Sequence, residues 1–146
     1  MMSGIRGKDT TPELVVRRFL HRHGLRYCLH RQDLPGRPDI VLPRHSTAVQ
    51  IHGCFWHRHP GCRYAYTPKS NRPFWRKKFE ENLARDRRTE AALRNGGWQV
   101  LIVWECEVTD GPTLRKLLRR VLRPRRLREE SENRAKGSKQ LSHTAK

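Results

Sequence analysis

The residues best suited to catalysis lie close together, between positions 36 and 62 of this 146-residue chain. Asp39 follows Pro38 and begins a short apolar run, Ile-Val-Leu, of the kind found in buried strands. An ionised carboxylate at such a place is costly unless an arginine or a cation compensates it. Mg²⁺ takes carboxylate and carbonyl oxygens and commonly drives phosphodiester hydrolysis. Asp39 is therefore a candidate Mg²⁺ ligand, and the alternative is an aspartate that caps a turn and pairs with Arg37.

A second apolar run, Thr47 to Ile51, is expected to lie beside the first one in a sheet. The backbone carbonyl of Ile51 could then give the metal a second oxygen. His52 and His57 follow directly, and an imidazole can act as general base or acid, or bind a phosphate. These residues predict a hydrolytic site where the two strands end.

Cysteines and histidines with metal-site spacing come next in the chain. Zinc in structural sites takes four nitrogen or sulfur ligands in a tetrahedron, with ligands close in sequence and the rest brought in by the fold. The spacing predicts a closed Cys3His zinc site made of Cys54, His59, Cys62 and Cys106. Such a site has no position for water, so it would staple a loop that has little core beneath it. Alternatives are His57 in place of His59, Cys28 in place of Cys106, free thiols, or two disulfides.

The elements that must position these residues follow from hydrophobic periodicity and from helix start and stop signals. Thr11-Pro12-Glu13 predicts a helix start with a hydroxyl cap, and Gly24 its end. The order of elements indicates one compact α/β domain with a mixed sheet flanked by helices. We expect helices at 11–23, 73–95 and 110–122, and strands at 25–29, 39–42, 47–51 and 98–104. The stripe of the last helix consists of Leu114, Leu117, Leu118, Val121 and Leu122.

The charge balance indicates a polyanionic partner. The chain has 32 Lys and Arg against 14 Asp and Glu, a formal net charge of +18, and nucleic acid is the commonest target of such a surface. An anionic membrane is the rival, but the sequence has no long apolar run and no signal segment, so we expect a soluble intracellular protein. We expect a flexible N-terminal segment at 1–10, the folded domain at 11–123 and a basic, disordered tail at 124–146.

Four blocks of sequence, taken in order, resemble one family. LPGRPDIVLP, HGCFWHRHPGC, the FWxxKxxxNxxRDxR pattern at 74–88 and GWQVLIVWEC are similar to the very short patch repair, or Vsr-type, endonucleases. The resemblance covers residues 2–122. It implies a restriction-endonuclease-like core with a structural zinc loop. It also implies an enzyme that nicks double-stranded DNA 5′ to the T of a T:G mismatch left by deamination of 5-methylcytosine.

The resemblance implies roles residue by residue. Asp39 matches the catalytic, Mg²⁺-binding aspartate, with the carbonyl of Ile51 beside it. His57 and His52 match active-site histidines, and Glu13 matches an acid that contributes to the site. The predicted zinc ligands match those of the family. It further implies a bacterial cytoplasmic, nucleoid-associated monomer that works with mismatch-repair factors.

The resemblance also implies how DNA is held. Phe55, Trp56 and Trp75 match aromatics that wedge into the DNA from the major groove, and Met2 matches a residue inserted from the minor groove. The Phe55–Trp56 pair is expected to be exposed, which suits a wedge. Packing against the zinc loop is the alternative for both rings. Basic residues of the long helix are expected to contact phosphates: Arg76, Lys77, Lys78, Arg85, Arg87 and Arg88.

Departures from the family pattern are few. Position 51 is Ile where some members have Thr, which a backbone carbonyl tolerates. The spacing between His59 and Cys62 varies among members, and a basic segment ahead of Met2 is missing, so a clamp that uses it is expected to be weaker. Two other functions stay open: a zinc-containing module that binds distorted DNA without cutting it, and a restriction-type nuclease that cuts paired DNA at a fixed site.

Overall fold

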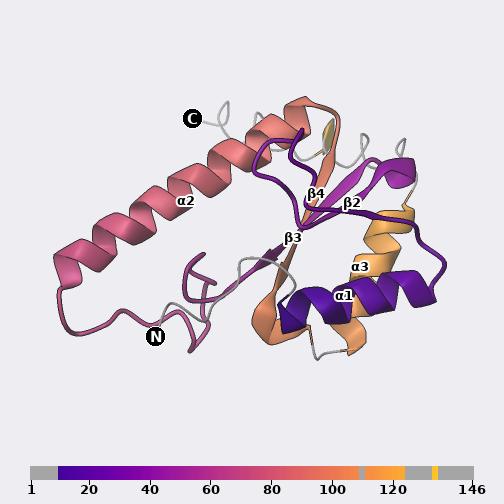
Figure 1. Cartoon of the computed structure of the whole chain (residues 1–146). Helices are drawn as coiled ribbons and strands as arrows, with labels where there is room; N and C mark the ends of the chain where they lie inside the picture. Colours follow the sequence, from indigo (N-terminus) through magenta and orange to yellow (C-terminus); the bar gives the residue numbers. More distant parts are fainter. Residues whose placement is uncertain (1–9, 109–110, 124–132, 135–146) are drawn as a thin grey trace.

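The computed structural model describes residues 10–108, 111–123 and 133–134. Figure 1 shows the elements, which follow the predicted order of helix, three strands, helix, strand and helix. The helices are α1 (Thr11–Arg22), α2 (Arg72–Asn95) and α3 (Gly111–Leu122). The strands are β1 (Cys28–Leu29), β2 (Ile40–Leu42), β3 (Thr47–His52) and β4 (Gln99–Trp104), with short 3-10 turns at Pro43–His45 and Glu105–Glu107.

The four strands form one sheet in the order β1-β2-β3-β4. β2 pairs antiparallel with both β1 and β3, whereas β3 and β4 run parallel, so the predicted mixed sheet is confirmed. The parallel pair sets His52 opposite Trp104 at its end. Both strands end there, which brings the loop after β3 and the turn after β4 together.

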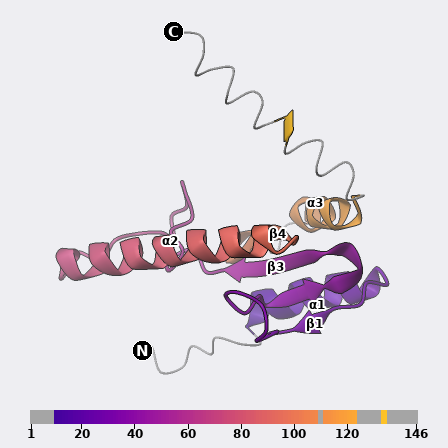
Figure 2. The same cartoon turned by 90° about the horizontal axis from the view of Figure 1, so that it is seen from above.

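Helices cover both faces of the sheet. α1 and α3 pack on one face, around buried side chains such as Val16, Leu101 and Leu117, while the end of α2 packs on the other through Leu93 (Figure 1). The first half of α2 extends beyond the end of β3, as Figure 2 shows from above. This free half forms one wall beside the loop that follows β3.

The predicted strand at 25–29 is wrong in its extent, because β1 has two residues. The N–H of Leu25 donates to the carbonyl of Leu20 (N···O 3.1 Å) and closes the end of α1, so it is not available to a sheet. The predicted hydroxyl cap is also wrong: Thr10 is the N-cap of α1, and its side chain makes no capping bond. Leu122 is 52% exposed and does not belong to the buried stripe of α3.

The predicted N-terminal segment, the predicted tail and Met2 lie outside the described residues, apart from Thr10 and residues 133–134. Within the described part of the chain, no helix has the length and apolarity needed to cross a membrane.

Candidate active site and metal cluster

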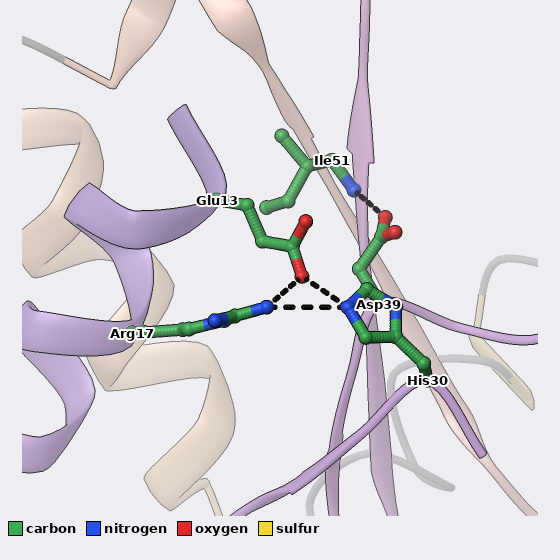
Figure 3. A network of polar contacts seen from close by, with 5 residues as sticks. All are labelled: Glu13, Arg17, His30, Asp39 and Ile51. Carbon is green, nitrogen blue, oxygen red and sulfur yellow. Dashed lines mark hydrogen bonds and ion pairs between the residues drawn. The ribbon is translucent and has the colours of Figure 1, made fainter. Parts of the chain in front are cut away.

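Asp39 stands at the start of β2, beside the end of β3. Its side chain is half-buried, and its Oδ2 accepts a hydrogen bond from the backbone N–H of Ile51 (2.8 Å; Figure 3). Burial raises the pKa of Asp39, and the neighbouring carboxylate of Glu13 adds to that increase. Among the described residues Asp39 has no ion pair with Arg37, which is exposed. A cation would therefore relieve an electrostatic cost that the described side chains leave in place.

Glu13 reaches the same place from α1. It is 1% exposed, and its Oε1 lies 2.5 Å from Arg17 Nη2 and 2.9 Å from His30 Nε2 (Figure 3). One ligand atom each from Glu13, His30 and Asp39 lie within 4.8 Å of one another. Two carboxylates so close repel each other when ionised, and hard divalent cations prefer such oxygens. The donor set therefore fits Mg²⁺.

His52 and His57 form a stacked pair next to Asp39. Their ring centroids are 3.9 Å apart, with planes inclined by 11°. His57 Nδ1 lies 2.7 Å from Asp86 Oδ2 on α2, and His52 Nε2 lies 3.2 Å from Gln50 Oε1. Burial, and secondly the charge of His57, lower the pKa of His52 to about 4. His52 is therefore neutral at pH 7, while Asp86 fixes the orientation of His57.

An open cleft of about 290 Å³ joins these groups. It lies between the start of β2, the end of β3 and the second half of α2. Arg37 and Arg85 give it positive charge beside the carboxylates. Its walls are Gly36, Arg37, Asp39, Gln50, Ile51, His52, His57, Arg85, Asp86 and Thr89. An anionic group can thus meet cations, an imidazole and a potential metal site in one place.

The four predicted zinc ligands come together at the other side of the loop. Their ligand atoms all lie within 4.8 Å of one another. Cys54 Sγ and Cys106 Sγ are 3.7 and 3.4 Å from His59 Nδ1, and Cys62 Sγ is 4.0 Å from Cys106 Sγ. A tetrahedron around zinc has edges of about 3.5–3.8 Å, so the spacing fits. The competing candidates His57 and Cys28 are not in this group.

Neighbouring side chains orient the cluster. His59 stacks on Trp104 with centroids 4.3 Å apart, and its Nε2 lies 3.7 Å from Glu107 Oε1. The backbone N–H of Cys54 donates to Glu105 Oε1 (3.1 Å). A carboxylate behind a ligating imidazole is the usual support of a metal site. The end of β4 thus supplies both a ligand and the groups that fix two others.

The predicted DNA wedge is a packed aromatic cluster. Phe55 lies 5.1 Å from Trp56, 5.6 Å from Trp75 and 5.3 Å from Phe79, measured between ring centroids. Phe55, Trp56 and Trp75 are half-buried, so the expectation that the Phe55–Trp56 pair is exposed was too strong. Phe74 and Tyr66, which the sequence did not single out, are the more exposed rings, at 52% and 62%.

Three side chains of the site were missed from the sequence. Asp86 lies in an Arg-Asp-Arg-Arg stretch, where an acid usually belongs to a solvated helix face, and its partner His57 is 29 residues away. Arg17 is four residues after Glu13, a spacing that could have indicated a helical ion pair. His30 had no local signal, because it reaches Glu13 through a turn in the left-handed region (φ 49°).

Comparison with known proteins gives consistent matches. Residues 1–63 match the family model described as DNA mismatch endonuclease Vsr. The chain is 50% identical over 124 residues to the type II nicking enzyme V.XorIIP of Xanthomonas oryzae pv. oryzae, which covers 85% of this chain and 90% of the relative. It is 40% identical over 105 residues to DNA mismatch endonuclease Vsr of Escherichia coli, covering 72% of this chain and 67% of the relative.

A solved structure has the same fold. The catalytic domain of the homing endonuclease I-Bth0305I matches with a TM-score of 0.53 at 18% sequence identity, over 77% of this chain and 94% of that domain. At this identity the match concerns the fold alone. The predicted restriction-endonuclease-like core with a mixed sheet is confirmed.

Proposed function

Because the chain belongs to the Vsr family of DNA mismatch endonucleases, we propose that it nicks one DNA strand 5′ to the T of a T:G mismatch. That it is a DNA endonuclease follows from the family; the mismatch, the strand and the metal are the proposal. The observation that carries it is the cleft, where Asp39, His52, His57 and Asp86 meet beside two arginines. A module that merely binds DNA has no use for a buried acid placed next to an oriented imidazole.

Mg²⁺ is the proposed catalytic cofactor. Asp39 and Glu13 would hold it, with the backbone carbonyl of Ile51 as a further oxygen, since these carboxylates already face one space. Bound there, the ion would neutralise charge on the phosphate and make water more acidic. The raised pKa of Asp39 supports this assignment, because burial and the carboxylate of Glu13 disfavour its charged form, which a bound cation would stabilise.

The histidines would handle the protons. When His57 donates Nδ1–H to Asp86, its Nε2 keeps a lone pair and can take a proton from water as general base. His52, neutral at pH 7, would stack against His57 and hold its ring without adding a second positive charge. We propose His57 as the base, His52 as its support and Glu13 and Asp39 as the acids of the site.

Zinc is the proposed structural cofactor, held by Cys54, His59, Cys62 and Cys106. The loop it closes carries His57 together with Phe55 and Trp56. Cys54 is fully buried, and burial raises the pKa of its thiol, which a cation would reverse. Four protein ligands leave no position for water, so this metal would not take part in the cut.

Recognition is proposed to use the weakness of the T:G pair. A wobble pair stacks less well than a normal pair, so inserting flat side chains costs less there, and the deformation itself becomes selective. Phe55, Trp56 and Trp75 would enter from one groove and Met2 from the other. Exposed basic residues of α2 would hold phosphates. One active site suffices for one nick, so we infer a monomer in which the domain at 11–123 acts alone. Mismatch-repair factors could then act on the nicked DNA.

End-labelled duplexes with T:G, or T:A at the same place, test the proposal in Mg²⁺. Wild-type protein should make one nick, 5′ to the T, in T:G duplexes alone. Asp39→Ala should lose nicking by several orders of magnitude and keep T:G binding. Retarded but uncut DNA with the wild-type protein would favour a non-cutting binder, and equal cutting of T:A would favour a restriction-type nuclease. Undiminished nicking by Asp39→Ala would overturn the assigned site.

A further inference from the structure

Arg58 lies between the catalytic His57 and the zinc ligand His59, and its backbone is in the left-handed region (φ 55°). Its guanidinium stands 3.9 Å from the ring centroid of Phe79 on α2. It also donates to the carbonyl of Phe55 (3.4 Å), the carbonyl of Tyr66 (2.9 Å) and the hydroxyl of Thr67 (3.1 Å). The planar, five-donor head of arginine is needed for this combination of stacking and several hydrogen bonds.

The partners of the loop lie along one face of α2. Trp75 touches Phe55 and Trp56, Phe79 carries Arg58, and Asp86 orients His57. Between them Asn82 Nδ2 donates to the carbonyl of Trp56 (3.5 Å). Positions 75, 79, 82 and 86 repeat at steps of four, three and four, which is one stripe of an α-helix. Four consecutive loop residues, 55–58, therefore contact one side of a single helix.

We propose that Arg58 is a positioning residue that couples the aromatic wedge to the catalytic base. This inference rests on the proposed function and adds a residue to it. Arg58 fixes the loop to α2 between the wedge and His57, so a shift of the aromatic rings on DNA changes the position of the imidazole. The mismatch would then allow the aromatic rings to insert, and their insertion would bring the imidazole of His57 into its catalytic position.

A different role for Arg58 is a phosphate contact. It lines a hollow of about 490 Å³ together with Arg72 and Arg76, and two further arginines could attract the DNA backbone. In that case positive charge alone would matter, and a lysine would serve. The internal hydrogen bonds to Phe55, Tyr66 and Thr67 favour positioning, because they take up three of the five N–H donors and hold the guanidinium against the loop.

The experiment compares Arg58→Ala, Arg58→Lys and Arg76→Ala, with T:G and T:A duplexes and protein of measured zinc content. If Arg58 is a positioning residue, both Arg58→Ala and Arg58→Lys should lower kcat on T:G on the order of tenfold to a hundredfold. Both should also narrow the ratio of binding affinities for T:G and T:A duplexes. Arg76→Ala, from the same hollow, should weaken binding to both duplexes alike. Recovery of kcat and of the affinity ratio by Arg58→Lys would overturn the proposal, as would a loss of affinity in Arg58→Ala that is equal for both duplexes.

Near-ultraviolet circular dichroism of the free proteins separates this inference from the proposed function. Both Arg58 variants should lose aromatic signal while far-ultraviolet spectra and zinc content stay as in the wild type. An unchanged aromatic signal would overturn the positioning role. If the wild-type protein nicks no duplex, the proposed function fails, and this spectral comparison alone decides whether Arg58 holds the cluster.

Discussion

Asp39 and His52 are titratable groups whose pKa values move in opposite directions for one physical reason. Burial disfavours the charged form, so it raises the pKa of the acid and lowers that of the base. Each group is thereby kept closer to neutrality before DNA or metal arrives. The environment of Asp39 therefore favours a cation, and His52 adds no positive charge beside His57 at pH 7.

The pKa of His52 predicts how stability depends on pH. Its folded value of about 4 lies below its ordinary value of 6.5, so between these values the unfolded chain binds more protons. Stability from this residue is complete above pH 6.5 and is lost as the pH falls towards 4, by up to about 3 kcal/mol. Urea unfolding at pH 7, 6, 5 and 4.5 should show a flatter dependence for His52→Gln than for the wild type.

Asp39 acts with the opposite sign, because its folded pKa is raised: its protonated form stabilises the fold as the pH falls through that value. Both proteins contain Asp39, so its contribution cancels when the free energy of unfolding of His52→Gln is subtracted from that of the wild type at each pH. Parallel pH curves for the two proteins would contradict a buried, uncharged His52.

Residue-level prediction succeeded where a spacing carried the information. The sequence spacing of three residues, Cys54, His59 and Cys62, and the position of Cys106 at a strand end were enough to predict that the four side chains come together. Asp86 could not be found this way, because a lone acid among arginines has no local pattern and its partner arrives by tertiary packing. The resemblance supplied Glu13, whose partner His30 again comes from a distant turn.

At the scale of elements, prediction worked for those with their own strong pattern. The central strands are apolar runs, and α2 has Pro73 in its first turn and glycines after its end, so their positions were correct within one residue or two. β1 was overestimated because an alternating pattern does not reveal that the N–H of Leu25 is already used by α1. The contact between loop residues 55–58 and α2 could not be predicted, since it depends on packing.

The proposed zinc site predicts that substitutions of Cys54 and Cys28 have different effects. Cys54→Ser removes a buried ligand, so zinc content, Tm, nicking and DNA binding should all fall, with a loss of several kcal/mol of stability. Cys28→Ser changes an exposed thiol outside the cluster and should leave all four as they are. Thermal unfolding with measured zinc content checks both. Normal nicking by a zinc-free Cys54→Ser protein would remove the structural role.

The loop before Asp39 packs closely against α2 at Gly36. At Gly36 (φ +70°) an added Cβ would come within 2.1 Å of Thr89 Cγ2, in the wall of the cleft. Gly24 has a similar φ of +77° and open space around it, so Gly24→Ala should cost about 1 kcal/mol for backbone strain alone. Gly36→Ala should cost clearly more and also lower nicking. Urea unfolding compares the pair, and equal losses would show that the clash is relieved freely.

At the scale of the whole molecule, the excess of positive charge governs affinity. With 32 basic residues, binding should weaken steeply with salt, and T:G and T:A duplexes should share nearly the same slope, because phosphate contacts carry no base information. Arg87→Ala, on an exposed position of α2, should reduce the log–log slope by about 1. Arg120→Ala on α3, across the sheet, is the matched control and should not. Fluorescence anisotropy from 50 to 300 mM salt, about the physiological range, measures both.

The parallel pairing of β3 with β4 has a consequence for how the nuclease comes into being. β2 and β3 are joined by a short turn and can pair as soon as they are made, but Ile51 and His52 meet Val103 and Trp104 from far along the chain. Such distant contacts form late. Cys106 follows immediately, and Asp86 also comes later than β3, so a half-synthesised chain carries His57 without Asp86 and His59 without Cys106. The complete set of site residues can thus come together only after most of the chain has been synthesised.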